Sequence, residues 1–325
     1  KLTTGGTPSY AFDISQSSTA PDGFSNSLKF SCSTADASLS STDVARLDHY
    51  IEAQNLQQLA YGTSAAKKLT LSFWARSSKT GDYRIWFFQN DATRSNAGSY
   101  TISAANTWEY KTVTIDGDVS GQFDNNSDRG LLISFALLAG TNYTTGTLPT
   151  SWQANVSANR FVGQTVNLAD STSNEWQITG VQLEVGDTAT PFEHRSYGDE
   201  LARCKRYYQE WYMSGYQGFP NTFRASNSPS IGSSVVAYLP TMRADPTVTL
   251  TRTQTLRLYR MTDGATVDVT SGLTASAQHR PNDAYKTQCE LRLGGTADAA
   301  VSNGVGYSAI SSGSGYIECE LDAEL

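Results

Sequence analysis

The sequence predicts an all-β protein made of two antiparallel β-sandwich domains joined by a short helix. The chain has 325 residues, which is longer than most domains with a single hydrophobic core, so two domains are expected. Charged residues are only 17% of the chain, while 17 Tyr and 12 Phe accompany abundant Gly, Ser and Thr, which favours short strands and polar turns. Helical periodicity is confined to one short segment near residue 200.

The first domain is predicted over residues 1–195. Its strands are inferred from the alternation of apolar and polar residues, and turn-forming runs at 77–82 and 116–130 separate them. The predicted strands are 69–76, 83–89, 108–115, 131–138, 161–168 and 176–185.

A connecting helix is predicted over residues 196–211, where the strand pattern gives way to helical spacing. Ser196 with Asp199 three residues later is typical of a helix N-cap. Four residues would then share one helical face: Leu201, Cys204, Tyr208 and Trp211.

The second domain, residues 212–325, is predicted to repeat the same style of strand and turn. Turns are expected at Asp263-Gly264 and at Gly294-Gly295. The predicted strands are 234–239, 247–252, 255–260, 287–293 and 315–321.

Composition and spacing argue against several classes of function. The net charge is −7 and neither half is basic, so no nucleic-acid partner is expected, and the longest apolar run, 131–139, is too short for membrane insertion.

The four cysteines form no C-x-x-C pair, and we expect buried free thiols. His49, His194 and His279 lack metal-binding or catalytic spacing, so we expect no metal, no cofactor and no enzymatic activity. The chain begins at Lys1 without a signal peptide, which indicates processing or the carboxy-terminal part of a longer protein.

One segment resembles a known family of viral proteins. Residues 179–195 read T-G-V-Q-L-E-V-G-D-T-A-T-P-F-E-H-R, and C-K-R-Y-Y follows at 204–208. Further agreement comes from G-Q-T-V-N-L-A-D ending at Asp170, L-P-T-M-R-A-D-P-T-V-T at 239–249 and the terminal D-A-E-L. Together these motifs resemble bacteriophage tail fibre and related virion appendage proteins over most of residues 69–325. Lys205 departs from the Gln more usual there, and residues 1–65 and 209–235 match no pattern of that family.

The resemblance implies a fold, a location and partners. Similar phage modules are jelly-roll sandwiches of the carbohydrate-binding type, so a carbohydrate-binding-like first domain and a fibre-tip second domain are expected. It also implies a homotrimer located on the virion, attached to other phage tail proteins and recognising a bacterial surface glycan or receptor. Three alternatives remain: an architectural appendage, a head-decoration protein and a polysaccharide depolymerase.

Candidate ligand-binding residues in the first domain come from the polar faces of predicted strands. Leu69, Leu71 and Phe73 would face the core, which leaves Trp74 and Arg76 on the opposite face. The neighbouring strands are expected to add Arg84, Trp86 and Tyr110 to that surface. A sugar stacks its C–H face on such rings while its hydroxyl groups take polar partners. The alternative role for the tryptophans is packing beneath a covering loop or helix.

The second domain offers further candidates in the aromatic segment 211–223. Tyr216, Phe219 and Phe223 lie among Gly and Pro, a context typical of exposed loops that bind partners. The alternative is that the phenylalanines seal the seam between the domains.

Overall fold

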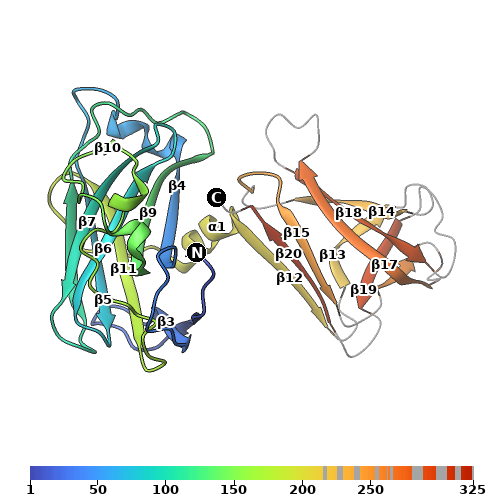
Figure 1. Cartoon of the computed structure of the whole chain (residues 1–325). Coiled ribbons are helices and arrows are strands. Elements are labelled where there is room, and N and C mark those ends of the chain that lie inside the picture. Colours follow the sequence, from blue (N-terminus) through green and yellow to red (C-terminus); the bar gives the residue numbers. More distant parts are fainter. Residues whose placement is uncertain are drawn as a thin grey trace. The chain divides into compact units, whose positions relative to one another are not determined.

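The computed structural model divides the chain into two compact units, Lys1–His194 and Arg195–Leu325 (Figure 1). It describes residues 1–214, 218–224, 230–237, 242–252, 256–261, 263, 266–279, 288–297, 306–311 and 316–323, and for much of the second unit only the backbone is described. The regular structure of the described residues is mostly antiparallel strands, so the predicted all-β class is confirmed.

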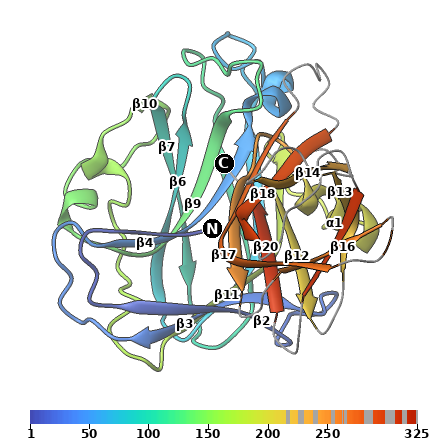
Figure 2. The same cartoon turned by 90° about the vertical axis from the view of Figure 1, so that its right-hand side faces the viewer.

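The first unit is a sandwich of two antiparallel sheets. The six-stranded sheet has the order β1-β4-β9-β6-β7-β10, and Figure 2 shows β7, β6 and β9 side by side. Its strands are β1 (Leu2–Gly5), β4 (Val44–Glu52), β6 (Gly81–Gln89), β7 (Arg94–Ile102), β9 (Arg129–Ala139) and β10 (Gln153–Ala154).

The five-stranded sheet has the order β2-β3-β11-β5-β8. Its strands are β2 (Ala11–Ser17), β3 (Ser27–Thr34), β5 (Leu69–Ser77), β8 (Glu109–Ile115) and β11 (Glu175–Val185). Three 3-10 helices lie in the connections: η1 (Ala53–Leu59), η2 (Thr141–Tyr143) and η3 (Ser157–Asn159).

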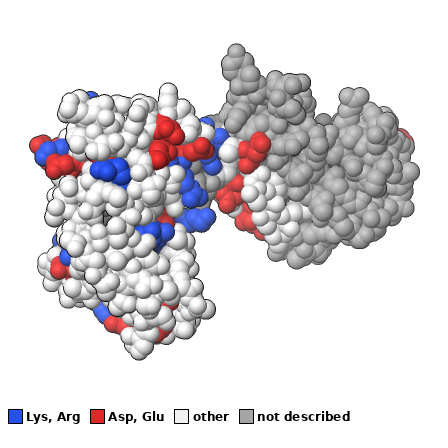
Figure 3. Space-filling model, turned by 45° about the horizontal axis from the view of Figure 1, so that its top comes forward, with Lys and Arg blue, Asp and Glu red and all other residues white. Residues whose placement is uncertain are grey.

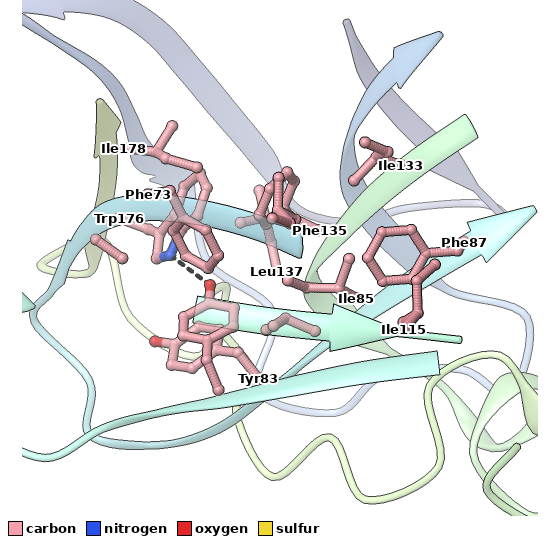
Figure 4. Packing of buried hydrophobic residues seen from close by; sticks show 14 of the residues in the cluster. Phe73, Tyr83, Ile85, Phe87, Ile115, Ile133, Phe135, Leu137, Trp176 and Ile178 are labelled. Atoms are coloured by element: carbon pink, nitrogen blue, oxygen red, sulfur yellow. Dashed lines mark hydrogen bonds between the residues drawn. The ribbon is translucent and has the colours of Figure 1, made fainter. Parts of the chain in front are cut away.

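The core lies between these two sheets, because alternate residues of each strand point inward. Tyr83, Ile85 and Phe87 are fully buried on the inner face of β6. Trp176 on β11 is also fully buried, and its Nε1 donates a hydrogen bond to the Tyr100 hydroxyl at 3.0 Å (Figure 4). The indole N–H, which would be costly to bury alone, therefore has its acceptor within the core.

One predicted strand of this unit is wrong. Residues 161–168 form turns and irregular structure, and their main-chain N–H groups bond to separate partners: Tyr143 O from Phe161, Asp82 O from Thr165 and Leu137 O from Leu168. Phe161, Val166 and Leu168 are buried one at a time against different neighbours, so their apolar character does not indicate a strand. Strands β1 to β4, β7 and β10 were not predicted.

The connecting helix begins as predicted but ends earlier. Helix α1 spans Tyr197–Lys205, and Asp199 N donates to the Ser196 hydroxyl at 3.2 Å, which confirms the N-cap. Tyr208 and Trp211 were expected on the helix, but they belong to strand β12 (Tyr208–Ser214), which pairs with β20 (Tyr316–Asp322). Aromatic residues favour strands, and a partner strand distant in sequence provides the ladder that local periodicity cannot reveal.

The second unit contains a small sheet and a closed barrel. The sheet has the order β12-β20-β15, with β15 at Thr247–Arg252. The barrel order is β13-β14-β18-β17-β16-β19, closed because β13 also pairs with β19. Its strands are β13 (Gly218–Arg224), β14 (Ser230–Ala237), β16 (Leu256–Arg260), β17 (Thr266–His279), β18 (Gln288–Ala297) and β19 (Gly306–Ser311).

Two expectations for this unit are corrected. A closed barrel stands where a second β-sandwich was expected, because the two terminal strands of the sheet, β13 and β19, pair with each other. Gly294-Gly295 lies inside β18 rather than in a turn, and Gly294 lies at register irregularities with both neighbouring strands. Glycine in a strand often marks such an irregularity.

Candidate functional site

The outer face of the five-stranded sheet carries a pair of aromatic rings. Trp74 on β5 is the register partner of Tyr110 on β8, and their ring centroids are 5.3 Å apart at an interplanar angle of 53°. Tyr110 is 45% exposed and Trp74 is partly exposed, so solvent reaches this pair. The neighbouring outward positions carry hydroxyl groups, with Thr112 on β8 and Thr179 on β11. The strand alternation that buries Phe73 therefore places a ring platform among polar side chains.

A cluster of charged side chains lies on the same face, beginning with Arg76, two residues from Trp74 on β5. Arg76 and Lys29 both form ion pairs with Glu175, and Arg76 Nε also donates to Asn106 O at 3.0 Å. Gln177 Nε2 donates to Glu175 Oε1 at 3.0 Å. Burial alone would raise the pKa of Glu175, but hydrogen bonds from Lys29 and Arg76 outweigh it and lower that pKa below its ordinary value. The carboxylate therefore stays ionised, and its partners are held in place.

The T-G-V-Q-L-E and A-T-P-F-E motifs hold the end of this unit against β11. Gln182 Oε1 accepts from Glu193 N at 2.8 Å, and Glu184 Oε2 accepts from Thr190 N at 3.0 Å. Gly180 has a φ of +60° at an irregularity in β11, and a Cβ there would lie 2.6 Å from the Phe24 ring. The motif glycine is therefore required for close packing.

Aromatic rings complete this packing. The Phe24 ring packs against Phe192 at 5.1 Å and against His194 at 5.3 Å. His194 thus lies among rings, which fits a structural role for the motif histidine.

Arg84 and Trp86 do not join the ring platform. They lie on β6, in the other sheet, and face outward on the opposite side of the sandwich. Trp86 is only 3% exposed because Phe161 and Arg160 cover it, and Arg84 Nε donates to Val162 O at 2.7 Å. The prediction that these two residues extend a solvent-facing site with Trp74 is corrected: they pack against the connection that crosses this sheet.

The second-unit candidates are placed only in part. Tyr216 lies outside the described residues. Phe219 and Phe223 belong to β13, and their side chains lie outside the described part of the chain.

The described residues contain no group of three or more metal-ligating His, Cys, Asp or Glu side chains. In the loop at 124–130, Asn126 Oδ1 accepts from Asp128 N at 3.0 Å, as in a polar turn. In the same part of the chain, no helix is both long enough and apolar enough to span a bilayer. Among the described residues that Figure 3 draws in blue, red and white, basic and acidic groups are intermingled and separated by uncharged areas.

Sequence reasoning missed Lys29, Glu175 and Thr179 as members of this surface. Lys29 lies in S-L-K-F-S-C, where Leu28, Phe30 and Cys32 alternate with polar residues, and this alternation is the signal that could have predicted β3. Its place beside Glu175 depends on the pairing of β3 with β11, which is not local information.

Comparison with known proteins gives no family for the chain. No family model matches the sequence, and no curated protein matches it.

Among solved structures, the enzymatically active domain of tailspike protein 4 from bacteriophage CBA120 is 14% identical with a TM-score of 0.31, covering 57% of this chain and 19% of that one. This chain therefore spans only about a fifth of the tailspike chain. A structure described as "CBM4 structure and function" is 11% identical with a TM-score of 0.27, covering 55% of this chain and 81% of that one. A family 11 carbohydrate-binding module of a cellulosomal cellulase from Clostridium thermocellum is 12% identical with a TM-score of 0.28, covering 59% and 90%. At these TM-scores none of the likenesses assigns a family or a function.

Proposed function

We propose that this chain is a non-catalytic receptor-binding component of a bacteriophage tail fibre, and that the outer face of its five-stranded sheet binds a bacterial surface glycan. The observation that carries the proposal is the solvent-reachable pair of Trp74 and Tyr110 in a polar face, on a chain whose motifs resemble tail fibre proteins. A pyranose has apolar C–H faces and polar edges. A ring pair bordered by hydroxyl and charged groups complements both.

The fixed ion-pair group supports selectivity for a polar ligand. Glu175 is an acceptor and Arg76 and Lys29 are donors, and all three are already held by their mutual contacts. A ligand hydroxyl group that bonds to them meets groups that lose little conformational freedom on binding, which favours affinity.

We also propose that the chain does not cleave the glycan that it binds. Glu175 has two cationic partners and a lowered pKa, so it is a poor general acid, the role that a glycosidase needs from one of its two carboxyl groups. Assembly as a homotrimer on the virion, together with other tail proteins, is proposed from the resemblance of the motifs to fibres.

The test uses the purified chain on an array of bacterial surface glycans, with a Trp74→Ala/Tyr110→Ala double variant as the matched control. The proposal expects selective binding by the parent chain, loss of that binding in the double variant, and no shortening of the bound glycan on long incubation. Release of shortened oligosaccharides would instead establish a depolymerase. Absence of binding to any glycan, together with unaltered attachment of phage carrying the double variant, would favour an architectural role.

A further inference from the structure

A second cluster of unusual side chains lies on the outer face of the six-stranded sheet, on the other side of the sandwich from the ring pair. Asp48 on β4, Ser134 on β9 and Trp86 on β6 are register partners in one row across three neighbouring strands. Arg46 precedes this row on β4, and Arg160 reaches it from the connection that follows η3. The guanidinium carbon of Arg160 lies 4.5 Å from the Trp86 ring centroid, and that of Arg46 lies 5.3 Å from it.

The charges of this cluster do not balance. Asp48 is its one carboxylate: Oδ1 accepts from the Ser134 hydroxyl at 2.6 Å, and Oδ2 lies 3.4 Å from Arg46 Nη2. Two guanidinium groups therefore share a single buried carboxylate. Burial, and then repulsion from Arg46, lowers the pKa of Arg160. An uncompensated positive charge in this partly buried cluster costs free energy, which a bound anion would recover.

The hydrogen-bond donors of the cluster point to the same ligand chemistry. Three buried N–H donors around the indole have no acceptor among the described residues, namely Arg46 Nη1, Trp86 Nε1 and Arg160 Nε, and Asp48 Oδ2 is the one buried acceptor of the cluster without a hydrogen bond. The Trp86 side chain is 97% buried, so its N–H cannot turn to bulk water. Guanidinium and indole N–H groups donate and never accept, and these three donors outnumber the single carboxylate oxygen, so the cluster is short of acceptors. With one excess positive charge, an oxyanion satisfies both the donors and the charge.

We propose that Arg46, Arg160 and the indole N–H of Trp86 form a binding site for a small oxyanion, of the carboxylate class. The site is separate from the Trp74–Tyr110 surface and does not depend on glycan binding there. A free carboxylate ion and the carboxylate of an acidic sugar share this chemistry.

The experiment follows the indole N–H resonance of Trp86 in the full chain, assigned by its loss in Trp86→Phe. Sodium acetate or sodium glucuronate replaces sodium chloride at constant sodium concentration, and glucose is the neutral control. We expect a saturable shift of the Trp86 resonance and a higher unfolding temperature with both anions, and neither effect with glucose. Arg160→Gln should weaken the binding at least about tenfold, because it removes a charged donor.

The matched control is Arg129→Gln. The guanidinium carbon of Arg129 lies 4.6 Å from the Tyr50 ring centroid on the same face, so the variant removes a ring-stacked arginine outside the cluster and should leave the anion response unchanged. If Arg160→Gln does not fold, Arg160→Lys replaces it as the variant that lacks the Nε donor. Tighter binding of glucuronate than of acetate would indicate an acidic sugar, and equal binding a free oxyanion. No shift with either anion, or a shift that the Arg160 variant leaves unchanged, would overturn the proposal.

Discussion

Replacing Trp86 by alanine is expected to destabilise the first unit strongly. The side chain is 3% exposed, its ring stacks on Phe88 at 4.8 Å, and Phe161 packs edge-on at 6.4 Å. Removing a buried tryptophan typically costs about 3–5 kcal/mol in the free energy of unfolding. In a unit of this size each kcal/mol lowers the unfolding temperature by about 2–4 °C, so a decrease of roughly 6–20 °C is expected.

Differential scanning calorimetry of the full chain measures this decrease, and Tyr110→Ala is the matched aromatic control. Tyr110 is 45% exposed, so its loss should cost about 1 kcal/mol or less. The transition that Trp86→Ala moves belongs to the first unit. A decrease below about 3 °C for Trp86→Ala would refute the reasoning, because it would mean that Trp86 is not held in a packed cluster.

Three further predictions follow from the protonation and burial of single groups. Burial raises the pKa of Tyr83 to about 12, whereas the same phenol in the unfolded chain ionises near pH 10. The stability of the first unit should therefore hold below about pH 10 and decline between about pH 10 and 12. The ultraviolet absorbance of the phenolate follows the ionisation. Hydrogen bonds from Lys29 and Arg76 lower the pKa of Glu175, so Glu175→Gln should reduce stability at pH 7, and this difference from the parent chain should disappear as the pH falls through the lowered pKa, as urea titrations at neutral and acidic pH would reveal. Ellman's reagent should label the exposed Cys204 in the folded chain and reach the buried Cys319, whose pKa burial raises to about 12, only on unfolding.

Local patterns predicted the strands that alternate cleanly. The core face of β5 follows from period-two alternation, because each residue's face depends only on its neighbours in sequence, and the strand near 131–138 follows from a continuous apolar run. Such patterns do not identify the sheet that a strand joins. Trp74 and Trp86 occupy similar outward positions in successive strands, and pairing with residues far along the chain places them on opposite sides of the sandwich.

The remaining errors also come from long-range contacts. Helix α1 ends at Lys205 because the following residues pair with β20, more than 100 residues away. The segment 161–168 contributes Phe161 to the cluster on one sheet and Val166 and Leu168 to the core, and neither role requires a strand. The ion pairs of Glu175 similarly join β3, β5 and β11, so no sequence window contains them.

The central claim is that the ring pair on the five-stranded sheet binds glycan. Its most direct test is the affinity of Tyr110→Ala for the glycan selected on the array, measured by isothermal titration calorimetry beside the parent chain and Tyr197→Ala, whose ring is 81% exposed in the other unit. A ring stacked on a sugar contributes about 1–2 kcal/mol, so Tyr110→Ala should weaken binding roughly five- to thirtyfold at nearly unchanged unfolding temperature, and Tyr197→Ala should bind like the parent chain. Equal affinities for all three folded proteins would contradict the claim.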